Sequence, residues 1–251
     1  MARSLTFVFA EAAEGLPLVA FAGRLSPSLM RRGLQFVYYC GRVPCRVVCL
    51  ERAFACMSWM PLRRTAESFP HKLYSLTAKV WHLYLFKRSH MFCGRCGAHL
   101  RFTPHQTVYC PRCGHEQWPH FAPAVIALIT RRQGREALLL SSRSFRRADS
   151  YGLLAGYLEP GETFEECLRR EVMEETSLTI TNIRYVASQS WPMKGAVMVA
   201  FTAEYQSGSL HLQESELRDG GWYTKDGLPP HIPPRDSIAR RLIDHWLSEG
   251  E

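Results

Sequence analysis

Residues 156–178, GYLEPGETFEECLRREVMEETSL, decide the fold of this chain. The second part of the stretch, TFEECLRREVMEET (163–176), is rich in strong helix formers and predicts a helix. Glu171, Glu174 and Glu175 stand there at i, i+3 and i+4, so three carboxylates share one helix face and repel one another. A hard divalent cation would remove this repulsion, and all-oxygen ligands fit Mg²⁺ or Mn²⁺ rather than zinc. The stretch therefore predicts a metal-binding helix.

Two further charged residues support this interpretation. Glu162 precedes the helix and can approach the acidic face from outside, while Arg170 can hold a neighbouring carboxylate in place. A solvent-exposed acidic helix without a metal is the alternative for any such run of glutamates. The residues around the run must decide between the two.

The stretch resembles the Nudix box, which reads glycine, five residues, glutamate, seven residues, then R-E-U-x-E-E-x-G-U with U apolar. The chain supplies Gly156, Glu162, Arg170, Glu171, Val172, Glu174, Glu175 and Leu178. Ser177 departs from the pattern, because the family has a glycine there that ends the helix in a left-handed conformation, which serine adopts only at some cost. The resemblance implies an α+β protein with the Nudix α/β/α sandwich fold, which hydrolyses a nucleoside diphosphate linked to another moiety.

Apolar segments with the character of strands flank the acidic helix. Two of them, PAVIALIT and EALLLSSRS, are separated by the polar turn RRQGR and predict a hairpin. The expected elements are strands over 123–130, 136–144, 183–191 and 197–205, and a closing helix over 237–247. We expect these elements to build one domain over residues 118–251.

Four cysteines precede this domain in two CxxC knuckles, Cys93 with Cys96 and Cys110 with Cys113, and thirteen residues lie between the pairs. In each knuckle two thiolates can converge on one tetrahedral ion at about 2.3 Å, and a short hairpin between the pairs closes the shell. Four thiolates leave no open position, so the pattern predicts a ribbon over 91–117 with one structural Zn²⁺ per chain. Coincidental core or redox cysteines are the alternative.

The remaining cysteines lack this spacing. Cys40, Cys45, Cys49 and Cys56 are expected to be buried apolar thiols on strands. Cys167 falls in the acidic helix, where packing is the expected role.

The odd total of nine cysteines, and an N-terminal apolar run that Glu11 and Glu14 interrupt, favour a reducing compartment without a signal peptide or membrane span. We therefore expect a soluble, cytoplasmic protein with no membrane partner.

Residues 1–90 are expected to form a small, mostly β N-terminal domain that ends in a connector helix. The segment LQFVYYCGRVPCRVVCL (34–50) looks like two strands joined around Gly41 and Pro44. Apolar residues then recur at helical spacing and predict the connector helix over 69–90.

The net charge of +8 is unevenly placed. Residues 1–92 hold 13 Lys and Arg against 4 Asp and Glu, whereas residues 93–251 hold 18 against 19. A polyanionic partner such as RNA would bind a basic region of this kind, and a solvated basic face is the alternative.

Features on both sides of the box resemble the NADH pyrophosphatases, also called NAD-cap decapping hydrolases. In that subfamily a four-cysteine ribbon precedes the Nudix domain and a motif close to SQPWPFPxS follows the box. This chain reads SQSWPMKGA (188–196), in which Ser188, Gln189, Trp191 and Pro192 match while Ser190, Met193, Lys194 and Ala196 depart. The similarity extends over residues 70–251. It implies a homodimer that hydrolyses NAD(H) to NMN(H) and AMP and also removes NAD caps from RNA 5′ ends.

The resemblance also assigns substrate-binding residues. Tyr157 occupies the position of an aromatic residue that stacks on nicotinamide, and Trp118 that of a second aromatic residue of the nucleotide pocket, although either could be a core residue. Glu216 matches a metal-binding glutamate beyond the box, with Glu214 as the less favoured neighbour. The predicted substrate-binding set is completed by Ala155, Gln189 and Trp191.

The metal ligands implied in this way are Glu171, Glu174, Glu175 and Glu216. They would hold two or more Mg²⁺ or Mn²⁺ ions against the pyrophosphate while a water attacks phosphorus and AMP leaves. Glu175 is the first choice for the residue that accepts the proton of the water and Glu162 the second, with Glu174 as a further catalytic candidate.

Two other functions stay open. One is a Nudix hydrolase for ADP-ribose or dinucleoside polyphosphates, favoured by the departures from SQPWPFPxS. The other belongs to a different class, a zinc-ribbon RNA-binding protein with an inactive Nudix domain. The intact set of carboxylates speaks against the second, because a retired site has no physical need for three mutually repelling glutamates.

Overall fold

The structure, a computed structural model, describes residues 5–11, 17–22, 33–40, 43–50, 57–62, 71–103, 107–145, 147–191 and 195–249. The chain divides into two compact units. One consists of Met1–Phe121 and Trp191–Gly195, and the other of Ala122–Ser190 and Ala196–Glu251. The division into segments 1–90, 91–117 and 118–251 stays a prediction.

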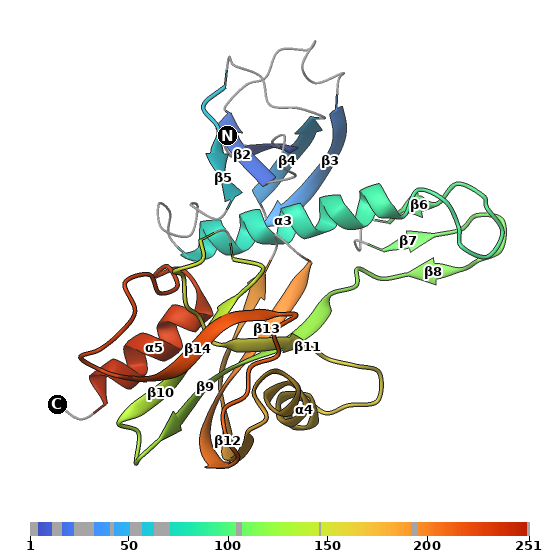
Figure 1. The fold of residues 1–251 in the computed structure, drawn as a ribbon. Coiled ribbons are helices and arrows are strands. Elements are labelled where there is room, and N and C mark those ends of the chain that lie inside the picture. The colour runs from blue at the N-terminus through green and yellow to red at the C-terminus, as the bar shows by residue number, and fades with distance from the viewer. Residues whose placement is uncertain are drawn as a thin grey trace. The chain divides into compact units, whose positions relative to one another are not determined.

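The second unit is built on a six-stranded sheet (Figure 1). Its main path runs β12 (Thr179–Trp191), β13 (Ala196–Ser207), β9 (Ala122–Arg131), β10 (Glu136–Ser142) and β14 (Leu217–Thr224), and β11 (Leu154–Tyr157) pairs with β9. Strands β9 and β13 are parallel, whereas β9 with β10, β9 with β11 and β10 with β14 are antiparallel. The expected hairpin of β9 and β10 is therefore present.

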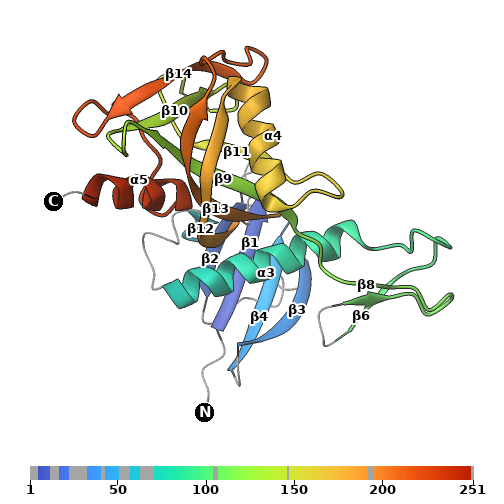
Figure 2. The same ribbon diagram turned by 90° about the horizontal axis from the view of Figure 1, so that it is seen from below.

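Each face of this sheet is covered by one helix (Figure 2). On β9, Val125, Ala127 and Ile129 join the core shared with α4 (Phe164–Thr176), as the alternation of a strand requires. The intervening residues Ile126 and Leu128 join the core shared with α5 (Ile238–Ser248). The expected α/β/α sandwich is confirmed.

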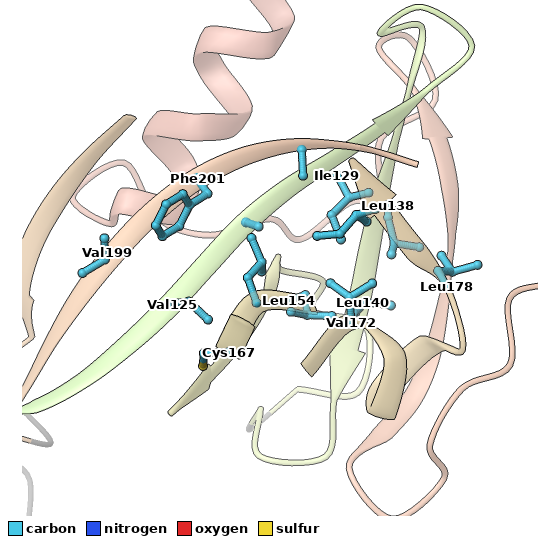
Figure 3. Close-up of a cluster of buried hydrophobic side chains, with 14 of the residues drawn as sticks. Val125, Ile129, Leu138, Leu140, Leu154, Cys167, Val172, Leu178, Val199 and Phe201 are labelled. Carbon is cyan, nitrogen blue, oxygen red and sulfur yellow. The ribbon is translucent and has the colours of Figure 1, made fainter. Parts of the chain in front are cut away.

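Helix α4 is fixed by one buried face and by both of its ends. Cys167, Leu168 and Val172 of the helix are fully buried, and Cys167 and Val172 point into the core cluster drawn in Figure 3. The side chain of Thr163 accepts a hydrogen bond from the backbone N–H of Glu166, and the Glu166 carboxylate accepts one from the backbone N–H of Thr163, which together form a capping box. These contacts orient the opposite, acidic face of α4.

The first unit contains a sheet of order β3 (Gly33–Cys40), β4 (Val43–Leu50), β1 (Leu5–Glu11), β2 (Pro17–Ala22) and β5 (Met60–Pro61). Strands β3 and β4 are antiparallel, in agreement with the pair expected within 34–50. Helix α3 (His71–Ser89) is the expected connector helix and packs Val80, Trp81 and Tyr84 against Phe7, Phe9 and Val47 of this sheet. No helix within the described ranges is long and apolar enough to cross a membrane.

The cysteine-containing segment follows α3 in the same unit. It forms a small antiparallel sheet of β6 (Arg101–Phe102), β7 (Val108–Tyr109) and β8 (Glu116–Gln117), seen in Figure 1 beyond the end of α3. Phe86 from the last turns of α3 packs against Leu100 and Val108, so this small sheet shares a core with the helix.

Candidate functional site

The three glutamates of the box lie on the acidic face of α4, at different depths. Glu175 is buried, with 5% of its surface exposed, whereas Glu171 is half-buried and Glu174 is exposed. The buried face of α4 dictates this gradient, because Glu175 lies next to Val172 and Thr176, which are both fully buried.

The strand beside α4 leaves space for only one kind of residue opposite Glu171. A Cβ atom placed on Gly156 of β11 would lie 1.9 Å from Cδ of Glu171. Any side chain at position 156 would therefore displace this carboxylate. The glycine of the box is explained by this close approach.

Arg170 joins the box glutamates to the loop before the helix. Its Nε donates to Oε1 of Glu162 at 2.6 Å and its Nη2 to Oε2 of the same carboxylate at 3.0 Å. Its Nη1 donates to Oε1 of Glu171 at 2.9 Å and to Oε2 of Glu174 at 3.0 Å, while Nη2 also donates to the carbonyl of Tyr157 at 3.0 Å. Hydrogen bonds from Arg170 hold the pKa of Glu162 at about 2. One guanidinium thus orients three carboxylates and the end of β11.

Glu175 is in a different electrostatic environment. Burial, and then the negative charges of Glu171, Glu216 and Glu174, raise the pKa of Glu175 to about 8. Burial also raises the pKa of Glu171, against the opposing effect of Arg170. Glu216, which is 41 residues further along the chain than Glu175, therefore lies near enough for its negative charge to act on Glu175. A set of oxygen donors around a buried carboxylate fits a hard divalent cation.

The predicted substrate-binding residues have varied surroundings in the second unit. Ala155 and Tyr157 are exposed on β11. Gln189 is held at both ends of its amide, since Nε2 donates to the carbonyl of Asp236 at 2.8 Å and Oε1 accepts from the backbone N–H of Ile238 at 2.8 Å. This residue ties β12 to the start of α5.

The other predicted residues of the nucleotide pocket belong to the first unit. Trp191 is half-buried, and Trp118 directly follows β8 with 60% of its surface exposed. The substrate-binding roles of Trp118, Trp191, Ala155, Tyr157 and Gln189 stay predictions. Residues 192–194 of the altered motif lie outside the described residues.

The four cysteines of the two knuckles converge. Their Sγ atoms all lie within 4.8 Å of one another, with 3.6 Å between Cys93 and Cys113 and 3.5 Å between Cys96 and Cys110. A tetrahedral ion with bonds of about 2.3 Å requires an S–S separation of about 3.8 Å. The cluster therefore has the size of a four-thiolate metal site and fits a zinc ribbon.

The two knuckles have the same backbone hydrogen bonds. The N–H of Gly97 donates to the carbonyl of Cys93 at 2.9 Å, and that of Gly114 donates to the carbonyl of Cys110 at 2.9 Å. The backbone N–H of Arg95 donates to Sγ of Cys93 at 3.4 Å, and such a hydrogen bond favours the thiolate that a metal requires. Positive φ values of 70° at both glycines explain their presence in the knuckles.

Cys167 is the described cysteine outside this cluster. Cys167 is fully buried in α4, and burial raises the pKa of its thiol to about 11. Its packing role agrees with the expectation. The predicted burial of Cys40, Cys45, Cys49 and Cys56 concerns side chains outside those that the structure describes.

Sequence reasoning did not identify Arg143 and Arg218, which surround the segment that carries Glu216. The backbone N–H of Arg143 donates to the carbonyl of Glu216 at 2.7 Å, and Nη2 of Arg218 donates to the carbonyl of Arg143 at 2.9 Å. These contacts join residues more than 70 positions apart, so no local pattern marks them. Glu214 is exposed and contributes its backbone carbonyl to the same contacts, because that carbonyl accepts from Nε of Arg143.

Comparison with known proteins identifies relatives over about three quarters of the chain. A NAD-capped RNA hydrolase NudC from Chromobacterium violaceum is 43% identical over 188 residues, which are 74% of this chain and 69% of that protein. A protein of the same name from Pseudomonas aeruginosa is 39% identical over 193 residues, 76% of this chain and 68% of the relative. Another, from Haemophilus influenzae, is 38% identical over 183 residues, 72% of this chain and 69% of the relative.

The chain also matches a solved structure and the model of a protein family. A Nudix hydrolase from Nitrosomonas europaea superposes with a TM-score of 0.52 at 22% identity, covering 62% of this chain and 89% of that one, which shows the likeness of the fold alone. The Nudix domain family matches residues 120–246, which include the box and its flanking strands. With this match and relatives of about 40% identity, the chain belongs to the Nudix hydrolase family.

Proposed function

We propose that this chain hydrolyses the pyrophosphate of NAD(H) to NMN(H) and AMP, and that it removes NAD from the 5′ ends of RNA by the same reaction. The observation that carries the proposal is that the negative charges of Glu171, Glu174 and Glu216 all act on buried Glu175. Arg170 pairs with Glu171 and Glu174, whereas no ion pair of Glu175 or Glu216 is found among the described residues, so a divalent cation would offset the negative charge that Arg170 leaves. The site therefore supports a metal-dependent hydrolase over a binding module with a retired active site.

Hydrolysis adds one water across the P–O–P bridge. A new P–O bond forms, the bridging P–O bond breaks, and a proton of the attacking water passes to a base. Mg²⁺ or Mn²⁺ bound by these carboxylates would offset charge on the phosphoryl oxygens and make the attacking water more acidic. Arg170 contributes by holding Glu162, Glu171 and Glu174 in fixed positions.

Glu175 is the preferred proton acceptor. General bases work best when their pKa lies near the working pH. The pKa of Glu175 is about 8 in the metal-free site, whereas hydrogen bonds from Arg170 hold that of Glu162 at about 2, which makes Glu162 a weak base. Glu162 is therefore better suited to keeping Arg170 in place.

The second metal site has a structural role in this proposal. Zn²⁺ held by Cys93, Cys96, Cys110 and Cys113 would be fully coordinated by thiolates, with no position left for a substrate. Its binding energy would contribute to folding of the first unit rather than to the reaction.

The choice of NAD(H) within the family is supported by the relatives, which carry the name NAD-capped RNA hydrolase. Tyr157 directly follows the box glycine and has 46% of its surface exposed, which suits an aromatic ring that stacks on nicotinamide. The basic residues within 1–92 would bind the RNA body. The proposal includes a homodimer in the cytoplasm.

One observation favours a second candidate, hydrolysis of ADP-ribose or of dinucleoside polyphosphates. The amide of Gln189 is engaged by the backbone at the start of α5, although this residue is one of the matches to the subfamily motif. Both of its polar groups are thus committed to the fold. The departures at Ser190 and Ala196 lie in the same motif.

Product analysis separates these candidates. Purified protein with Mg²⁺ or Mn²⁺ would be incubated with NADH, with ADP-ribose and with NAD-capped RNA, and the products separated by chromatography. The proposal predicts NMNH with AMP from NADH, and NMN with 5′-monophosphate RNA from the capped RNA. Faster cleavage of ADP-ribose than of NADH would favour the second candidate, and an absence of products from all three would contradict the proposal and the hydrolysis of ADP-ribose.

A further inference from the structure

The segment that carries Glu216 is attached to the end of α4. The backbone N–H of Gln213 donates to the carbonyl of Glu175 at 2.9 Å, and that of His211 donates to the carbonyl of Thr176 at 3.0 Å. The N–H of Glu216 then donates to the carbonyl of Gln213 at 3.0 Å, which closes a turn. Backbone hydrogen bonds therefore lead from the buried carboxylate residue of α4 to Glu216.

Arg143 holds the same segment from the opposite side. It follows β10, its backbone N–H donates to the carbonyl of Glu216 at 2.7 Å, and its Nε donates to the carbonyl of Glu214. Two hydrogen bonds from one residue to carbonyls on either side of Ser215 restrict both the position and the rotation of the segment.

Arg218 braces Arg143 in turn. Its Nη2 donates to the carbonyl of Arg143 at 2.9 Å, and its Nη1 donates to the carbonyl of Phe145 at 3.1 Å. Arg218 is the second residue of β14, and its planar guanidinium reaches the loop that follows β10. The two arginines and the Glu214–Glu216 segment form one hydrogen-bonded unit, which we call the arginine brace.

The brace matters because the side chain of Glu216 is not held by other side chains. Among the described residues, no ion pair or side-chain hydrogen bond of Glu216 is found, and the residue is exposed. Its negative charge nevertheless acts on both Glu171 and Glu175. The direction of this carboxylate therefore depends on its backbone.

We propose that the side chain of Arg143 is a positioning group, which acts through the backbone carbonyl of Glu214 to keep the Glu216 carboxylate near those of α4 as a ligand for a divalent cation. The inference rests on the proposed function, because it assumes that this cluster binds the catalytic metal. Residues that orient a metal ligand without touching the ion typically change metal affinity by roughly 10-fold or more when they are removed. Removing the Arg143 side chain is expected to weaken metal binding by an amount in this range.

Arg147 provides a matched control in the same loop. It is an exposed arginine too, but its guanidinium donates to Oδ1 and Oδ2 of Asp149, both at 3.0 Å, and lies 2.7 Å from Nε2 of His231. Replacing it removes the same positive charge without touching the Glu214–Glu216 segment.

The test is a titration of Mn²⁺ into Zn²⁺-loaded protein, with free Mn²⁺ measured by its electron paramagnetic resonance signal. This readout requires no turnover. Arg143→Ala removes the Nε donor to Glu214 and keeps the backbone N–H that donates to Glu216. It should weaken Mn²⁺ binding about 10-fold, Arg147→Ala should leave it unchanged, and Arg143→Ala should add no further loss in a Glu216→Gln background. If Arg143→Ala does not fold, Arg143→Lys serves in its place, since it keeps the charge and removes the Nε–H donor.

Three results would overturn the inference. They are Mn²⁺ binding by folded Arg143→Ala equal to wild type, equal losses in the two arginine variants, and a full additional loss in the double variant. Unchanged Mn²⁺ binding together with a loss of activity confined to NAD-capped RNA would instead assign Arg143 to RNA phosphates. Failure of the proposed function is recognised separately, as wild-type protein that binds Mn²⁺ normally and cleaves none of the three substrates.

Discussion

At the residue scale, Glu175 is where function and stability conflict most clearly. A carboxyl group with 5% of its surface exposed, surrounded by other carboxylates, is unfavourable in its charged form. Residues that carry out chemistry are often kept in such positions at the expense of stability. Removal of the charge should therefore affect stability and activity in opposite directions.

The stability effect can be predicted with its pH dependence. The pKa of Glu175 is raised from 4.5 to about 8 by burial and neighbouring carboxylates, so the folded state binds this proton more tightly than the unfolded state. The contribution of this proton to the free energy of unfolding is fully present below about pH 4.5 and is lost as the pH rises through about 8. In Zn²⁺-loaded protein without Mg²⁺ or Mn²⁺, Glu175→Gln should melt at a higher temperature than wild type at pH 9, with little difference at pH 5.

Glu165→Gln is the control for this experiment, because Glu165 is exposed in the first turn of the same helix. It should change the melting temperature little at either pH. A melting temperature of Glu175→Gln equal to or below that of wild type at pH 9 would show that Glu175 is not strained in the folded protein.

Tyr157 carries the prediction on substrate choice. If its exposed ring stacks on nicotinamide, Tyr157→Ala should remove roughly 1–3 kcal/mol of stacking from NADH and much less from ADP-ribose, which has no nicotinamide ring. The ratio of kcat/KM for NADH to that for ADP-ribose should then fall about 10-fold or more. Equal losses on both substrates would identify Tyr157 as a packing residue or an adenine platform.

At the scale of elements, the end of α4 carries Ser177 in place of the glycine of the Nudix box, and this departure is expected to lower the free energy of unfolding. Ser177 has φ of 57°, which is the left-handed conformation that the glycine of the family favours. Ser177→Gly should therefore raise the free energy of unfolding by about 0.5–1 kcal/mol, measured by urea denaturation.

The control for Ser177→Gly is Ser209→Gly. Ser209 is exposed and is not among the described residues with positive φ. A glycine at this position therefore relieves no backbone strain and only increases the conformational entropy of the unfolded chain. Stability unchanged or reduced in Ser177→Gly would mean that the serine is accommodated without strain.

The zinc ribbon should behave as a structural element. Chelation of zinc or Cys110→Ser should lower the melting temperature, because four thiolates without a metal lose the binding energy that holds the two knuckles together. Iodoacetamide at pH 8 should then modify the knuckle cysteines, while Cys167, with a buried thiol of pKa about 11, stays unmodified in the folded protein. Metal analysis that finds no tightly bound zinc in purified protein would contradict this account.

Elements with a strong local signal could be predicted from the sequence. Helix α4 agrees closely with the predicted span because its pattern, its capping residues and its acidic face all lie within one stretch. Strand β14 was not predicted, because LRDGGWYT contains residues that disfavour strands, and its pairing with β10 provides what local propensity does not. The short β11 likewise depends on its partner β9.

The residues of the candidate site also differ in whether a local sequence pattern predicts them. The α4 glutamates and the four cysteines follow from spacing, because helix periodicity and knuckle geometry are local. The backbone hydrogen bonds of Arg143 and the engagement of Gln189 by α5 involve partners distant in the chain, which depend on the tertiary fold. No single-sequence pattern contains that information.

At the scale of the whole molecule, the two proposed metal sites belong to different units. The cysteine cluster lies within Met1–Phe121, whereas the carboxylates of α4 and Glu216 lie in the unit that contains the sandwich. Loss of zinc and loss of a carboxylate should therefore have separable effects, the first on the melting of its unit and the second on the reaction. This separation lets activity report on the carboxylates alone when the protein is loaded with zinc.

The most direct test is the rate of NADH cleavage at saturating Mn²⁺ by zinc-loaded wild type, Glu175→Gln and Glu165→Gln, with AMP and NMNH quantified by chromatography. The account predicts equal amounts of the two products from wild type and from Glu165→Gln. It predicts a rate lower by about 100-fold or more for Glu175→Gln, the scale of a general base or a metal-assisted step. Near-normal turnover by Glu175→Gln, or wild-type protein that releases no AMP from NADH, would contradict it.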